Sequence, residues 1–267
     1  MKIITRLFYG LMLLLLCPFH QAAQHKDTTI YINTRAIDIQ YPQGKAKGTI
    51  LMLPGWNFSR KKTCEQSNFC SKATKAGFLL ICPEMGKSLY ASAVYPESRK
   101  DWTGYPQLHF ITDTLEPYLQ KQFNLLRPGQ KNFIYGISTG ARGGALILEH
   151  SDSLFCGAAL LSGDYEQTLD PKDNLMNGYY GSIDQFKSRW EGEDNPCRHT
   201  DKIKASLYLG HGMKDEVVSY KQSLAFEAAL MKHHVKYVFV TPELAGHNYA
   251  FWGTETEAVL RFFEKKL

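Results

Sequence analysis

The stretch Gly136-Ile137-Ser138-Thr139-Gly140 constrains the fold of this chain more than any other segment. An apolar run at 133–135 leads into it, and a helical pattern of small residues at 141–150 follows it. Strand, sharp turn and helix form the context in which Gly-x-Ser-x-Gly makes a nucleophile elbow. The two glycines suit a strained turn, where Cβ atoms would collide with the departing helix. The pattern predicts Ser138 as a nucleophile; the alternative is a glycine-rich turn that happens to hold a serine.

A serine nucleophile requires a neighbouring base and an acid that fixes the tautomer of that base. In α/β-hydrolases these residues follow in the order serine, acid, histidine. Asp215 comes after the apolar run 205–209 and fits the acid, and His247 comes after the run 235–240 and fits the base. Two rivals stay open: Glu216 is the adjacent carboxylate, and His211 also follows a strand, although it precedes the acid.

Acyl transfer also needs N–H donors that face the developing oxyanion. The first is expected from Thr139, directly after the serine, and the second from the loop after an earlier strand. The β-like run 49–53 ends in Pro54-Gly55-Trp56, so Trp56 N–H is the predicted second donor. The alternative for this loop is a plain Pro-Gly turn that ends a strand.

Apolar runs alternate with helical patterns along most of the chain, after a leading hairpin at 29–40. This alternation predicts an α/β fold, with a mainly parallel, doubly wound sheet and helices on both faces. Ligands bind at the carboxyl ends of the strands in such sheets, which is where the candidate residues lie. The expected strands are 49–53, 78–82, 132–135, 157–161, 205–209 and 235–240, and the expected helices end at 75 or span 107–122, 141–150, 220–232 and 254–266.

The first 23 residues differ in kind from the rest. Lys2 and Arg6 precede an apolar segment at 7–19, and small residues follow at 22 and 23, which is typical of a secretory signal peptide. We therefore expect a secreted or periplasmic protein with one domain at 24–267, and lipidation at Cys17 is the weaker alternative. Without the leader, 29 basic residues stand against 26 acidic ones, a net charge of +3. Such a small excess gives no reason to expect nucleic acid as a partner, and no later segment predicts a membrane span.

Five cysteines remain after the leader, and an exported chain with this many is expected to form disulfides. Cys64 and Cys70 stand six apart and are predicted to pair, as are Cys156 and Cys197, whereas Cys82 lies in an apolar strand and is expected to be a buried free thiol. The cysteines and histidines lack zinc-ligand spacing, so we expect no metal and no cofactor.

A long polar and aromatic excursion at about 162–202 follows the strand 157–161. Aromatic rings at the predicted active-site edge suit sugars or an aromatic acyl group, whereas long acyl chains require an aliphatic tunnel. The predicted substrate-binding residues are Tyr179, Trp190, Tyr249 and Trp252. The alternative for the rings of the excursion, Tyr179 and Trp190 among them, is packing of the excursion onto the body of the domain.

Several separated segments of residues 45–267 resemble the esterase D and S-formylglutathione hydrolase-like branch of the α/β-hydrolases. They are 63–69, 136–140, 181–190, 212–215 and 246–249. The resemblance implies the α/β-hydrolase fold, and a Ser138, Asp215 and His247 triad with Trp56 and Thr139 as oxyanion donors. It also implies an ester acyl group and leaves the alcohol open, and with the aromatic loops we expect a small-molecule or saccharide ester as substrate. We expect a secreted serine esterase for short-chain or hydroxycinnamoyl esters of carbohydrates; the alternatives are an exported serine peptidase or acyltransferase and a non-catalytic binding module.

Overall fold

A computed structural model describes residues 26–151 and 153–267. The predicted signal peptide and Cys17 lie outside the described residues. Within the described ranges, no helix combines the length and the apolar character needed to cross a bilayer.

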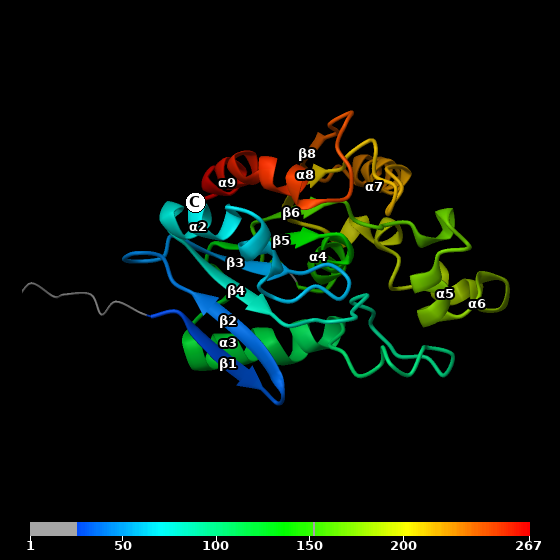
Figure 1. The fold of residues 1–267 in the computed structure, drawn as a ribbon, viewed down its shortest axis with the longest axis horizontal. Helices are drawn as coiled ribbons and strands as arrows, with labels where there is room; N and C mark the ends of the chain where they lie inside the picture. Colours follow the sequence, from blue (N-terminus) through cyan, green and yellow to red (C-terminus); the bar gives the residue numbers. More distant parts are fainter. Residues whose placement is uncertain (1–25, 152) are drawn as a thin grey trace, which may run out of the picture.

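One eight-stranded sheet organises the chain, in the order β1-β2-β4-β3-β5-β6-β7-β8 (Figure 1). The first two strands form the predicted hairpin, and β2 also pairs antiparallel with β4, whereas every other neighbouring pair is parallel. The predicted α/β-hydrolase fold, with its mainly parallel sheet, is therefore confirmed. The strands are β1 (Thr28–Ile32), β2 (Arg35–Gln40), β3 (Gly48–Leu53), β4 (Phe78–Pro83), β5 (Asn132–Ile137), β6 (Gly157–Leu161), β7 (Ser206–Gly210) and β8 (Tyr237–Val240).

Helices cover both faces of this sheet, because alternate side chains of the buried central strands point to opposite faces. Ile50 of β3 packs in a core with α2, α8 and α9, whereas Leu51 packs in the opposite core with α3, α4 and α7. The helices are α1 (Lys62–Gln66), α2 (Phe69–Ala76), α3 (Glu116–Phe123), α4 (Thr139–His150), α5 (Asn174–Tyr180), α6 (Ile183–Trp190), α7 (Lys221–Lys232), α8 (Tyr249–Thr254) and α9 (Thr256–Glu264).

Two of the expected helices differ in detail. The helix expected to end at residue 75 is two short helices, because the extended backbone of Ser67 ends α1 before α2 begins. The helix expected at 107–122 starts as a π-helical segment, Phe110–Leu115, and continues as α3 to residue 123. The excursion after β6 holds α5 and α6, which stand beyond the carboxyl ends of the parallel strands (Figure 1).

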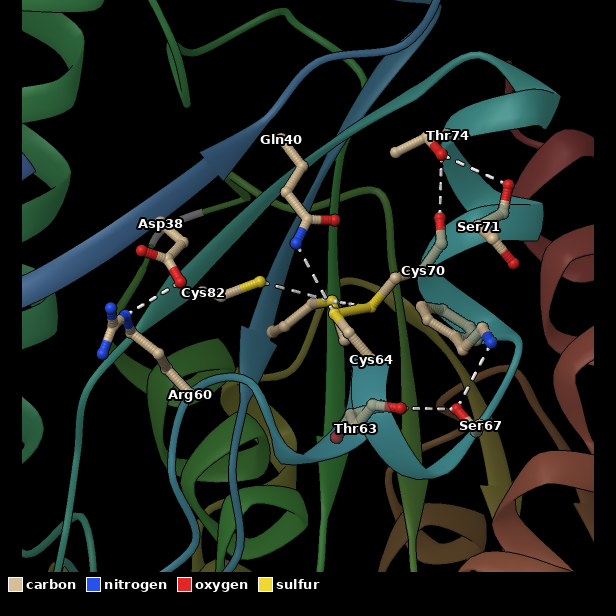
Figure 2. Close-up of a disulfide and its surroundings, with 12 residues drawn as sticks. Asp38, Gln40, Arg60, Thr63, Cys64, Ser67, Cys70, Ser71, Thr74 and Cys82 are labelled. Carbon is tan, nitrogen blue, oxygen red and sulfur yellow. Dashed lines mark hydrogen bonds and ion pairs between the residues drawn. A yellow bond between two sulfur atoms is a disulfide. The ribbon is translucent and has the colours of Figure 1, made fainter. Parts of the chain in front are cut away.

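The cysteines follow the prediction in part. Cys64 and Cys70 form a disulfide that joins α1 to α2, with the Gln40 side chain directed at it (Figure 2), and Cys82 is a buried free thiol, as predicted. The predicted Cys156–Cys197 pair is wrong, since both thiols are free. Cys156 packs against the core that contains α2 and α9, whereas Cys197 packs against the core that contains α4 and α7. The sheet therefore separates the two thiols.

Candidate active site

Ser138 lies in the sharp turn between β5 and α4 and has a strained backbone, with φ 55° and ψ −128°. A Cβ at Gly136 would lie 2.3 Å from the Gly140 carbonyl oxygen, so the departing helix requires glycine there, as expected. A Cβ at Gly140 would instead lie 2.1 Å from the carbonyl oxygen of Leu53, in the neighbouring strand β3. The turn thus combines the two glycines with a φ angle that non-glycine residues adopt only under strain. It lifts the Ser138 hydroxyl to the carboxyl end of the sheet.

The three residues of the predicted triad meet at this edge, although 109 positions separate Ser138 from His247. His247 Nε2 lies 2.9 Å from Ser138 Oγ, and His247 Nδ1 lies 2.7 Å from Asp215 Oδ2. His247 follows β8 and Asp215 follows β7, as the apolar runs indicated. The Asn248 side chain caps α8 by accepting the N–H of Phe251, so the chain enters a helix immediately after the imidazole. The geometry suits proton transfer from Ser138 to His247.

Asp215 is held as a carboxylate by the hydrogen bonds around it. Its Oδ1 accepts the backbone N–H groups of Val217 and Val218 at 2.9 and 2.8 Å. Burial alone would raise the pKa of Asp215, but hydrogen bonds from His211 and His247 hold it well below its ordinary value. The rival carboxylate, Glu216, is exposed to solvent. The geometry therefore places Asp215, and not Glu216, behind the imidazole.

Two backbone N–H groups beside Ser138 have no acceptor within the described parts of the chain, and they belong to Trp56 and Thr139. Thr139 is the first residue of α4, where helical N–H groups lack an intrahelical partner. The turn before Trp56 approaches the nucleophile closely, since a Cβ at Gly55 would lie 3.0 Å from the Ser138 Cβ. Both residues line the same cavity as Ser138. Their placement fits the predicted oxyanion hole.

The four aromatic residues expected to bind substrate lie elsewhere. Tyr179 and Trp190 are completely buried in a cluster beneath the excursion, with the Trp190 indole donating to the Gly181 carbonyl. The prediction for these two is wrong, because long-range packing turns their rings away from the solvent. Trp252 packs edge-on against His247 at 5.0 Å, and Tyr249 packs edge-on against Trp252 at 4.8 Å. Neither ring lines the cavity at Ser138: Trp252 packs against the imidazole, and Tyr249 packs against Trp252.

A cavity of about 340 Å³ opens beside Ser138 and His247. Trp56 and Phe58 line it near the predicted oxyanion hole, and Val217 and Val218 line it near Asp215. The excursion contributes most of the remaining wall, with Leu175 and Met176 as apolar residues and Asp164, Asp170 and Asp173 as acidic ones. The cavity is thus apolar near the catalytic serine and acidic on one side.

The three aspartates were not anticipated from the sequence. Burial raises the pKa of Asp164 to about 6, against the opposing effect of the Arg142 guanidinium. Its Oδ1 is buried and has no hydrogen-bond partner among the described residues. The only available signal was the acidic character of the excursion, which does not reveal which carboxylates face the cavity.

Comparison with known proteins places this site in context. A sequence model of the prolyl oligopeptidase family matches residues 85–267, and no curated protein matches the chain. Among solved structures, an S-formylglutathione hydrolase from Agrobacterium tumefaciens is similar, with a TM-score of 0.72 and 14% identity over 90% of this chain and 94% of that one. A ferulic acid esterase has a TM-score of 0.66 and 15% identity, with 90% and 96% covered. A puromycin-hydrolyzing peptidase from Mycobacterium tuberculosis has a TM-score of 0.66 and 16% identity, with 90% of this chain and 40% of that one covered.

Proposed function

Because this chain belongs to the prolyl oligopeptidase family and is a serine hydrolase of the α/β-hydrolase fold, we propose that it is an exported esterase. Its substrates are short-chain or hydroxycinnamoyl esters of carbohydrates. The observation that carries the proposal is the hydrogen-bonded line of Ser138, His247 and Asp215 beside the unpaired N–H groups of Trp56 and Thr139.

Each group has one role in the reaction. Ser138 Oγ attacks the ester carbonyl while His247 Nε2 takes the hydroxyl proton, and the N–H groups of Trp56 and Thr139 donate to the oxyanion. His247 then returns the proton to the leaving alcohol, which departs and leaves an acyl-serine. Water attacks this acyl-enzyme by the same route in reverse and releases the acid. Asp215 stays ionised throughout and holds the Nδ1–H of His247.

The cavity supports a small acyl group. Its volume of about 340 Å³ is at the lower end of the range of ligand pockets, and rings or short aliphatic side chains line it near Ser138. An acetyl group or one planar aromatic acyl group fits such a space, whereas a chain of about ten carbons would extend past its apolar wall. We expect turnover of p-nitrophenyl esters to fall beyond about six acyl carbons, by about 10- to 200-fold.

The redox state of the cysteines supports export. The Cys64–Cys70 disulfide is typical of oxidising compartments such as the periplasm or the cell exterior. Fractionation of cells that express the full chain, with mass analysis of the mature N-terminus, tests this part of the proposal. Retention of an intact N-terminus in the cytosol would contradict it.

The catalytic proposal is tested by labelling with a fluorophosphonate, followed by the ester panel. The wild type is expected to be labelled once, and Ser138→Ala is expected to lose both the label and turnover. Ser71→Ala is the matched control, because Ser71 is exposed on α2 and its hydroxyl donates to the Asn68 carbonyl, away from the site. An unlabelled wild type, or turnover that survives in Ser138→Ala, would refute the proposal.

A second candidate, a peptidase for substrates with a free amino group, is favoured by the acidic wall of the cavity. Asp164, Asp170 and Asp173 line it, and the described lining residues include no lysine or arginine. A protonated amine would supply the donor that the buried Oδ1 of Asp164 lacks. The family model is consistent with this chemistry.

Matched substrates separate the two candidates. An aminoacyl p-nitroanilide and its N-acetylated form differ in one charge, and the peptidase candidate predicts that the free amine is preferred at pH 7. Asp164→Asn should remove most of that preference, because the amide keeps the shape and loses the charge. Equal rates for the two anilides, together with rapid hydrolysis of acetylated or feruloylated saccharides, would leave the esterase as the function.

A further inference from the structure

A second imidazole lies behind the acid of the triad, and the mechanism above does not use it. His211 is the first residue after β7 and is completely buried. Its Nε2 lies 3.3 Å from Asp215 Oδ2, the same oxygen that accepts from His247 at 2.7 Å. Asp215 therefore stands between two imidazoles.

The partners of His211 fix which nitrogen carries the proton. Nε2 lies 2.9 Å from the carbonyl oxygen of Val218, which can only accept, so Nε2 is the donor. Nδ1 lies 2.7 Å from Ser223 Oγ, whose hydroxyl can donate to its lone pair. The Nε2–H thus donates to the Val218 carbonyl, and the nitrogen that carries it also lies 3.3 Å from the Asp215 carboxylate. The Val218 N–H in turn donates to the other oxygen of Asp215, which closes a ring of polar contacts around the acid.

The charged and titratable groups around this ring are few. Asp215 faces both imidazoles, and Tyr220 packs its ring edge-on at 6.0 Å from that of His211. On the substrate side, Asp164 interacts electrostatically with His247. Ser223, from α7, is neutral and buried.

We propose that His211 is a positioning residue of the triad, acting through Asp215; the proposal rests on the function proposed above. Its Nε2–H holds the carboxylate in the orientation in which Asp215 Oδ2 meets His247 Nδ1. The same N–H partly neutralises the negative charge of Oδ2. A carboxylate that shares its charge with two donors stabilises the His247 imidazolium less than a carboxylate with one. Without the His211 donor, more of the carboxylate charge would face His247, so the acid limb of kcat/KM is expected to move to higher pH.

Two isosteric substitutions separate this role from simple packing. The amide nitrogen of His211→Gln reaches the position of Nε2 and keeps the donor to Asp215. The amide of His211→Asn reaches only the position of Nδ1, so it keeps the contact with Ser223 and loses the donor. Both variants replace the imidazole with a neutral amide, and each therefore controls for the other.

The readout is the pH dependence of kcat/KM on a small p-nitrophenyl ester. We expect the acid limb in His211→Asn to move up by about 0.5 to 1 pH unit, and kcat/KM on the plateau to fall about 10- to 100-fold, as for loss of one hydrogen bond to a charged group. His211→Gln should stay close to the wild type in the acid limb. An unshifted limb in a folded His211→Asn, or equal shifts in both variants, would overturn the proposal.

A measurement on the wild type removes the dependence on variants that fail to fold. Nitrogen-15 NMR of the histidine side chains at pH 7 should place a proton on His211 Nε2, and a neutral ring protonated only on Nδ1 would overturn the proposal. This spectrum needs no turnover. If fluorophosphonate fails to label the wild type, the proposed function fails while the proton position of His211 is still determined.

Discussion

Replacing Asp215 with asparagine exchanges one carboxylate oxygen for an amide NH₂ and leaves the size of the side chain unchanged. The N–H groups of Val217 and Val218 require an acceptor, so they hold the remaining oxygen at the position of Oδ1. The new NH₂ then occupies the position of Oδ2, 2.7 Å from His247 Nδ1. Because the NH₂ donates, His247 must accept at Nδ1 and carry its proton on Nε2. In this tautomer it cannot take the proton of Ser138.

The size of the effect follows from this reversal. The variant loses the general base in its main tautomer and the carboxylate that stabilises the imidazolium, while the N–H groups of Trp56 and Thr139 are untouched. We expect kcat to fall by about 10⁴-fold, which corresponds to about 5 kcal/mol of transition-state stabilisation. Ser138→Ala should cost at least as much.

The assay is steady-state hydrolysis of a short p-nitrophenyl ester, with thermal unfolding to show that the variant is folded. Glu216→Gln is the matched control, since it neutralises the adjacent carboxylate, which is exposed. It should retain activity within about twofold of the wild type. Activity of Asp215→Asn within tenfold of the wild type, or a large loss in Glu216→Gln, would refute the assignment of the acid.

Three further predictions concern stability. Replacing Cys64 and Cys70 with serine should lower the free energy of unfolding by about 2 kcal/mol, because the disulfide closes a loop of six residue steps. Urea unfolding of the wild type and the double variant measures this difference. Gly140→Ala should cost about 1 to 3 kcal/mol of stability and reduce activity, since its Cβ would meet the Leu53 carbonyl. Gly104→Ala, with open space around the residue, should change neither stability nor activity. An unaffected Gly140→Ala would contradict the tight turn. Burial raises the pKa of Glu116 from 4.5 to about 8, so the stability from its bound proton is full below pH 4.5 and is lost as the pH rises toward 8. Glu116→Gln should therefore stabilise the protein by about 2 to 3 kcal/mol more at pH 7 than at pH 5 in urea unfolding, and an equal effect at both values would contradict the burial argument.

Local patterns in the sequence were sufficient for the sheet and for the triad residues. The strands of a parallel sheet are buried on both faces, so they appear as continuous apolar runs, and the turn at Ser138 needs glycine on both sides for steric reasons. The loops after β7 and β8 lie at the same edge in any sheet of this topology. Asp215 and His247 could therefore be assigned from their chain order.

Only the tertiary structure decided which residues line the cavity, whether Cys156 and Cys197 pair, and which residue lies behind Asp215. Tyr179 and Trp190 were expected at the substrate because aromatic rings suit both a pocket and a core, and composition does not distinguish these environments. Cys156 and Cys197 have compatible spacing, but the sheet lies between them. His211 was considered as a rival base, whereas its burial beneath Asp215 shows a different relation to the triad. In each case the outcome depends on which face of the sheet a side chain meets, and contacts between residues far apart in the chain determine that.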